Sequence, residues 1–322
     1  MPGIILHNHF AKTVYSGISE EARQKIENIN LYELAANGAD TLLYRHFLSK
    51  KALLRNEELY LNMHCKNTKA FLVELARATR LNKDLYPYLC GYLCHYYLDA
   101  ITQPYVFYKS GIYDVNVNNS VKYRGLHQKI QRGMDSYVLE NYFNANPNTF
   151  NIASKILKLK KLPKTILQDI NVIYEKVYDI DDAYKLINES IRSQRRFYQF
   201  IYDPIGIKNE ILSKIDNGKS IIDLNYLSYY NKSINIRKFD IFNFKHERWC
   251  NPTNDTLTSI DSYFDLFDSA KRIAIEAIDA LYKYIYLDEE INFDKYFADV
   301  SMLTGLPCNK TREFKYFNNV FK

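Results

Sequence analysis

A histidine and an aspartate lie four residues apart in a stretch apolar enough to be buried, Gly91-Tyr-Leu-Cys-His95-Tyr-Tyr-Leu-Asp99. On a helix, residues i and i+4 share one face, so His95 and Asp99 would point the same way. Gly91, one turn earlier, would leave open space beside them. Because a buried charge is costly unless it is paired or bound to a metal, this pair requires partners elsewhere in the chain.

Four further residues could supply those partners, and all of them lie in the first 130 residues: His7, Asp40, His64 and His127. Zinc binds mixtures of imidazole nitrogens and carboxylate oxygens of this kind. The spacing leaves two interpretations open. One is a metal cluster, and the other is a helical core in which the histidines are satisfied and Asp40 only caps a helix.

The composition is that of an ordinary globular protein, because 47% of the 322 residues are hydrophobic and 25% are charged. The net charge of +6 slightly favours anionic partners, including phosphates or a membrane surface. The Lys and Arg residues form only short clusters, which usually belong to solvated faces. We therefore expect no nucleic-acid partner.

The sequence also suggests a location. The N-terminal segment lacks a basic start followed by a long apolar stretch, which is unlike a secretory signal. No window approaches the ~18 uninterrupted apolar residues of a membrane span. The five cysteines contain no CxxC pair. We therefore expect a cytoplasmic protein with reduced thiols and no transmembrane segment.

Apolar residues recur with helical spacing along most of the chain. The pattern predicts helices over residues 56–80, 84 to about 101, 123–142 and 262–286. The second should not continue past Gln103, because Pro104 disfavours helical geometry in the residue before it. Alternating strand patterns bounded by turn signals are not found. The predicted fold class is all-α.

The order of these motifs resembles the zinc-dependent phospholipase C family. The resemblance is carried by His7, Gly38-Ala-Asp40, Met63-His64, the stretch from Gly91 to Asp99, Gln103-Pro104-Tyr105, and His127 with Gln131 and Met134-Asp135. The family includes secreted bacterial enzymes, the catalytic domain of clostridial alpha-toxin, and cytoplasmic bacterial members, to which this chain is more similar. Trp249-Cys-Asn-Pro252 is similar to the end of the cytoplasmic members.

This resemblance implies a single multi-helix, all-α domain of the phospholipase C and zinc nuclease type over residues 1–322. The motif-bearing part would cover residues 1–145, and a helical C-terminal part would cover residues 146–322. A cluster of up to three zinc ions would lie at the base of a cleft.

The resemblance also implies which residues hold each zinc ion. One ion would be held by Asp40, His64, His95 and Asp99. A second would use His7, with Asp99 as a bridge and, in the secreted enzymes, the N-terminal amine. Asp40 would serve both as a ligand and as the general base.

The third zinc site of the family departs from its pattern in this chain. His127 is kept, but Gln103 stands where the cytoplasmic members have histidine and Gln131 stands where the family has glutamate. A neutral amide oxygen is a poor zinc ligand beside imidazole and carboxylate. We therefore expect one or two zinc ions and an absent or weak third.

The function that the resemblance implies is hydrolysis of a phospholipid or a soluble phosphodiester by a zinc-activated water. Tyr, Lys and Arg side chains on helix faces would allow transient contact with a membrane surface. The two glutamines favour an alternative, a catalytically impaired metal-binding relative with a regulatory or structural role. A zinc nuclease is a third possibility, and a helical scaffold without metal is the fourth.

Overall fold

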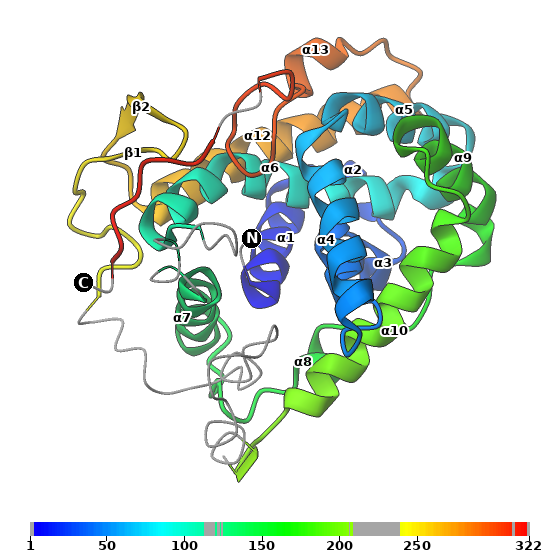
Figure 1. Ribbon diagram of the computed structural model, residues 1–322. Coiled ribbons are helices and arrows are strands. Elements are labelled where there is room, and N and C mark those ends of the chain that lie inside the picture. The colour runs from blue at the N-terminus through cyan, green and yellow to red at the C-terminus, as the bar shows by residue number, and fades with distance from the viewer. Residues whose placement is uncertain are drawn as a thin grey trace.

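The computed structural model describes residues 3–112, 120, 123, 125–205, 207–208, 239–310 and 313–320, and this part of the chain is mostly helical (Figure 1). The α-helices are α1 (Ile4–Gly17), α2 (Glu20–Gln24), α3 (Ile29–Ala35), α4 (Lys50–Cys65), α5 (Thr68–Leu81), α6 (Tyr86–Ser110), α7 (Leu126–Asn141), α8 (Ile152–Lys155), α9 (Leu167–Tyr178), α10 (Ala183–Ile201), α12 (Tyr263–Tyr286) and α13 (Phe293–Tyr296). Three 3-10 helices join them: η1 (Gly38–Tyr44), η2 (Lys83–Leu85) and η4 (Lys164–Ile166). The prediction of an all-α fold is confirmed at this level.

Helix α6 runs through the middle of the molecule, with other helices around it (Figure 1). It packs against α12, α3, α1, α5 and α7, and nearly all of its side chains are buried. A helix that is apolar on all sides is stable only when neighbours cover every face. The His95–Asp99 pair on α6 therefore lies in the interior, as its apolar surroundings predict.

The predicted end of this helix at Gln103 is wrong. Helix α6 continues through Pro104 to Ser110. A proline inside a helix costs about 3 kcal/mol because it leaves the carbonyl of residue i−4 without its hydrogen bond. That carbonyl belongs to Ala100, and Gly305 packs so closely on it that a Cβ atom there would lie 2.7 Å from the oxygen. Burial of the last turns of α6 outweighs the local penalty.

Gly91 does not leave open space, contrary to the expectation from its spacing. A Cβ atom on Gly91 would lie 2.2 Å from the carbonyl oxygen of Tyr32 and 2.8 Å from Cβ of Ala35. Both of these residues belong to α3. The missing side chain is therefore used for close packing of α3 on α6.

Two of the predicted helices are confirmed and one is divided. The segment over 56–80 is two helices, α4 and α5, separated at Asn67, whose φ of 52° is left-handed. Helix α7 ends within a residue of its prediction, and α12 covers the predicted range. The start of α12 has a capping box, in which Ser262 accepts from the backbone N–H of Asp265 and the Asp265 carboxylate accepts from that of Ser262.

Strands β1 (Trp249–Asn251) and β2 (Asn254–Ser259) form an antiparallel hairpin that the pattern analysis missed. The strands are short, and β2 is largely exposed, so no alternation of buried and exposed residues marks it. The ring of Trp249 packs edge-on against Tyr105 of α6, with their centroids 5.4 Å apart. In the described part of the chain, no helix combines the length and the apolar character that crossing a bilayer requires.

Candidate metal centre

Five of the six predicted ligands meet in one buried cluster. They are His7 on α1, Asp40 on η1, His64 at the end of α4, and His95 with Asp99 on α6. Each is at most 5% exposed. Residues more than ninety positions apart in the sequence thus converge on one point in the core.

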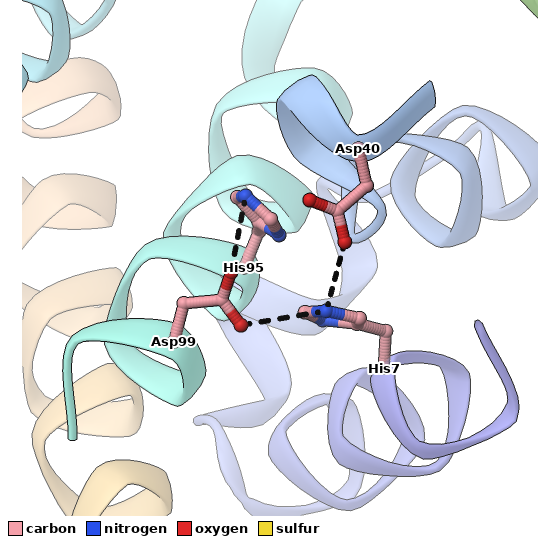
Figure 2. A group of neighbouring side chains, drawn as sticks. All are labelled: His7, Asp40, His95 and Asp99. Atoms are coloured by element: carbon pink, nitrogen blue, oxygen red, sulfur yellow. Dashed lines mark ion pairs between the residues drawn. The ribbon is translucent and has the colours of Figure 1, made fainter. Parts of the chain in front are cut away.

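Figure 2 shows four of the five residues, with the Asp99 carboxylate between His7 and His95 and the Asp40 carboxylate beside His7. His7 Nε2 lies 3.4 Å from Asp40 Oδ2 and 3.5 Å from Asp99 Oδ1. His64 Nε2 lies 3.3 Å from Asp40 Oδ1 and 3.5 Å from Asp99 Oδ2. His95 Nε2 lies 3.7 Å from Asp99 Oδ2 and 3.2 Å from His64 Nε2.

These separations suit donors that surround a cation better than donors that bind one another. A charge-assisted hydrogen bond between imidazolium and carboxylate is about 2.7–2.9 Å long. Four ligands held tetrahedrally at about 2.0–2.2 Å from one zinc ion lie about 3.3–3.6 Å from one another. One donor atom each from His7, Asp40, His95 and Asp99 all lie within 4.8 Å of one another.

The carboxylates of Asp40 and Asp99 each turn one oxygen toward His7 and the other toward His64. The cluster therefore has two halves that share both carboxylates. One half contains His64 and His95, and the other contains His7. This arrangement could hold one or two metal ions, with the aspartates as bridges.

Several donor atoms of the cluster lack a hydrogen-bond partner among the described residues. They are His7 Nε2, Asp40 Oδ1 and both carboxylate oxygens of Asp99. A buried carboxylate oxygen without a hydrogen bond is costly, so a cation is a partner that this donor set fits. The backbone of Tyr60 orients the His64 ring. His64 Nδ1 donates a hydrogen bond to the carbonyl oxygen of Tyr60 at 2.9 Å, and this turns His64 Nε2 toward the carboxylates.

The histidines differ in how readily they are protonated. Burial opposes protonation of His64, but the Asp40 and Asp99 carboxylates outweigh it and raise its pKa to about 9. Burial lowers the pKa of His95 to about 4 despite the same carboxylates. Burial alone would raise the pKa of Asp40 and Asp99, but the charges of the neighbouring histidines, His95 foremost, hold both below their usual value. A divalent cation would therefore displace a proton from His64.

Gly38 is the residue that lets η1 bring Asp40 to the cluster. Its φ of +47° is left-handed, and a Cβ atom there would lie 2.0 Å from the His95 ring. The sequence motif contains Gly38, but only the structure shows that its role is to make room for a ligand.

Gly38→Ala is expected to displace His95 and to lower both stability and metal content. The left-handed backbone alone would lower the free energy of unfolding by about 1–2 kcal/mol. Denaturant unfolding and elemental analysis of the purified variant would measure the two effects. Gly17→Ala is the control, since its Cβ atom would meet only the end of the flexible Ile275 side chain. Unchanged metal content in Gly38→Ala would contradict this account of η1.

Asp135 on α7 fixes the start of α1, which has no side-chain cap of its own. Its Oδ1 accepts from the backbone N–H of Leu6 at 3.0 Å, and its Oδ2 accepts from that of Ile5 at 3.4 Å. Asp135 is fully buried, and a Cβ atom on Gly3 would lie 2.2 Å from its carboxylate. Because a carboxylate at a helix N-terminus satisfies orphan N–H groups and complements the helix dipole, Asp135 holds α1 and therefore His7 in place.

Asp135→Ala is expected to loosen the His7 half of the cluster and leave the other half intact. The free energy of unfolding should fall by about 1–3 kcal/mol, and the metal that His7 binds should be lost first. Asp135→Asn keeps a side-chain acceptor and should retain more metal. Elemental analysis with denaturant unfolding of both variants measures this. Equal metal content in Asp135→Ala and the unmodified protein would show that α1 is held by other contacts.

The structure places the sixth predicted ligand differently. His127 on α7 stacks on Phe107 with ring centroids 4.6 Å apart, and its Nδ1 lies 3.2 Å from Ser110 Oγ. Burial lowers its pKa well below the usual value. His9 also lies away from the cluster donors, stacked against Phe267 of α12.

No protein-family model, curated protein or solved structure matches this chain. The centre therefore has to be interpreted from its own geometry.

Proposed function

We propose that the cluster of His7, Asp40, His64, His95 and Asp99 binds zinc and that the chain is a zinc-dependent phosphodiester hydrolase of the phospholipase C type. The observation that supports the metal site is the set of separations between histidine nitrogens and carboxylate oxygens, 3.3–3.7 Å, around buried donor atoms, several of which have no hydrogen-bond partner among the described residues. The order of the motifs in the sequence supports the reaction class.

The donor set favours zinc over other common divalent ions. Three imidazoles and two carboxylates suit zinc, whereas magnesium and calcium prefer sites built only from oxygen. The glutamines at positions 103 and 131 limit the proposal to one or two ions. When bound, zinc would lower the pKa of a water and neutralise the phosphate oxygens.

The residues of this chain would bind the metal, exclude bulk water and accept a proton. All five residues, including Asp40, would hold the metal, and burial would keep bulk water away from them. Asp40 is the proposed general base, because its side chain is the most accessible of the five at 7% exposed. A carboxylate oxygen of Asp40 would take the proton of the attacking water.

A second candidate is a metal-binding relative without catalytic activity, in which zinc has a structural or regulatory role. Two observations favour it. The donors of the cluster are nearly inaccessible within the described structure, and neutral glutamines replace two ligands of the third site. A buried closed site is typical of structural zinc, whereas a catalytic site keeps a position open.

Hydrolysis of p-nitrophenyl phosphorylcholine and of phosphatidylcholine vesicles by zinc-loaded protein tests the proposal. Turnover should be lost with a chelator and should return with added zinc. Asp40→Asn should reduce turnover by at least about 100-fold, the lower end of the range for a general base. Asp181→Asn, at an exposed position, is the matched control. Turnover that survives chelation would overturn the proposal, and zinc binding without turnover would support the second candidate.

A further inference from the structure

Two glutamines near the cluster have buried amide atoms without partners. Gln103 is fully buried, and neither its Nε2 nor its Oε1 has a hydrogen-bond partner among the described residues. The Nε2 of Gln131 is also buried and without a partner in the same part of the chain. A buried amide without partners costs stability, so two of them close to one site indicate a ligand group that satisfies them.

The position of Gln103 follows from its neighbours on α6. Asp99, Gln103 and Phe107 stand four residues apart and therefore share one face. Asp99 contacts His7 of α1, and Phe107 stacks on His127 of α7. Gln103 lies between these two contacts, so it faces the junction of α1, α6 and α7.

The position of Gln131 follows in the same way from α7. His127, Gln131 and Asp135 stand four residues apart on one face. His127 meets α6 through Phe107, and Asp135 meets the start of α1 through Leu6. Gln131 therefore faces the same junction, which Figure 1 shows beside the central helix.

We propose that Gln103 and Gln131 form an uncharged subsite that donates hydrogen bonds from their amide nitrogens to a phosphoryl oxygen held at the metal centre. This inference rests on the proposed function, since it names a substrate-binding part of the same site. The ligand chemistry is a phosphoryl group, from either free phosphate or a phosphodiester. Amides suit this task because they donate to an oxygen anion without adding negative charge beside Asp99.

Calorimetric titration of zinc-loaded protein with inorganic phosphate tests the subsite without requiring turnover. The double variant Gln103→Met/Gln131→Met keeps the approximate side-chain volumes and removes all four amide atoms. Its dissociation constant for phosphate should rise by about 10-fold to 100-fold, as expected for lost hydrogen bonds to a charged group. Its zinc content should not change, and its melting temperature without phosphate should be equal or higher, because buried unpaired amides are removed.

The matched control is Gln128→Met, at an exposed position on the same helix, which should leave phosphate affinity unchanged. A parallel titration with dihexanoyl phosphatidylcholine separates the two ligand sources. A loss of affinity for either probe supports the subsite and identifies its source. Equal affinity of the double variant and the unmodified protein for both probes, at equal zinc content, would overturn the subsite alone. A protein that takes up no zinc and binds neither probe would overturn the proposed function as well.

Discussion

Replacing Asp99 with alanine is expected to abolish metal binding in both halves of the cluster. Asp99 turns one oxygen toward His7 and the other toward His64 and His95, so both halves lose one of the two carboxylates that they share. The affinity for zinc should fall by more than about 100-fold, since outer-shell changes alone reach that size. Elemental analysis after gel filtration would measure the loss.

The same variant should also lose the stabilisation that metal provides. A ligand at 100 to 1,000 times its dissociation constant stabilises the folded state by about 2.7–4.1 kcal/mol. A chelator should therefore lower the melting temperature of the unmodified protein by about 4–6 °C and leave that of Asp99→Ala unchanged. Asp181→Ala, at an exposed position, is the control and should respond to the chelator as the unmodified protein does. A chelator effect of equal size in Asp99→Ala would mean that metal binds elsewhere.

The double variant Gln103→His/Gln131→Glu is expected to bind one zinc ion more than the unmodified protein. The two substitutions supply an imidazole and a carboxylate at the junction where His127 already lies against α6. A further cation would help to neutralise the phosphate and the leaving oxygen, so turnover of p-nitrophenyl phosphorylcholine should rise at least about tenfold. Elemental analysis and a steady-state assay measure the two effects separately.

Each single variant is an internal control and should gain neither zinc nor activity. Gln128→Glu tests whether any added carboxylate on the same helix has the same effect, and it should have none. No additional zinc in the double variant would show that His127 cannot turn from Phe107 to a metal. Additional zinc without greater turnover would show that low catalytic activity is not caused by the glutamines at these two positions.

The candidate ligands could be named from the sequence because each lies in a short motif whose residue types and spacing suit a metal site. The i and i+4 spacing of His95 and Asp99 needs only a helix, and the apolar residues between them need only burial. His7, Asp40 and His64 were predicted as partners, and the structure brings all three to that pair. The identity of the metal and the hydrolase activity stay predictions.

Other parts of the site depend on contacts that no local pattern contains. Asp135 caps α1 from a position 129 residues away from Leu6 in the sequence. The space that Gly91 was expected to leave is filled by α3, and the cost of Pro104 within α6 is outweighed by burial of the last turns of that helix. Each of these outcomes is decided by the neighbours of a residue in space. The short hairpin escaped prediction because β1 has only three residues and β2 is largely exposed.

The zinc content of the purified protein, measured together with that of His95→Ala, tests the central claim most directly. The account predicts about one or two zinc ions per chain and a clear loss in the variant, because His95 lies 3.2 Å from His64 Nε2 in one half of the cluster. Protein that holds no zinc when purified without chelator, even after zinc is added back, would contradict the account. The buried carboxylates and histidines would then be a polar core, and the proposed hydrolase function would be withdrawn.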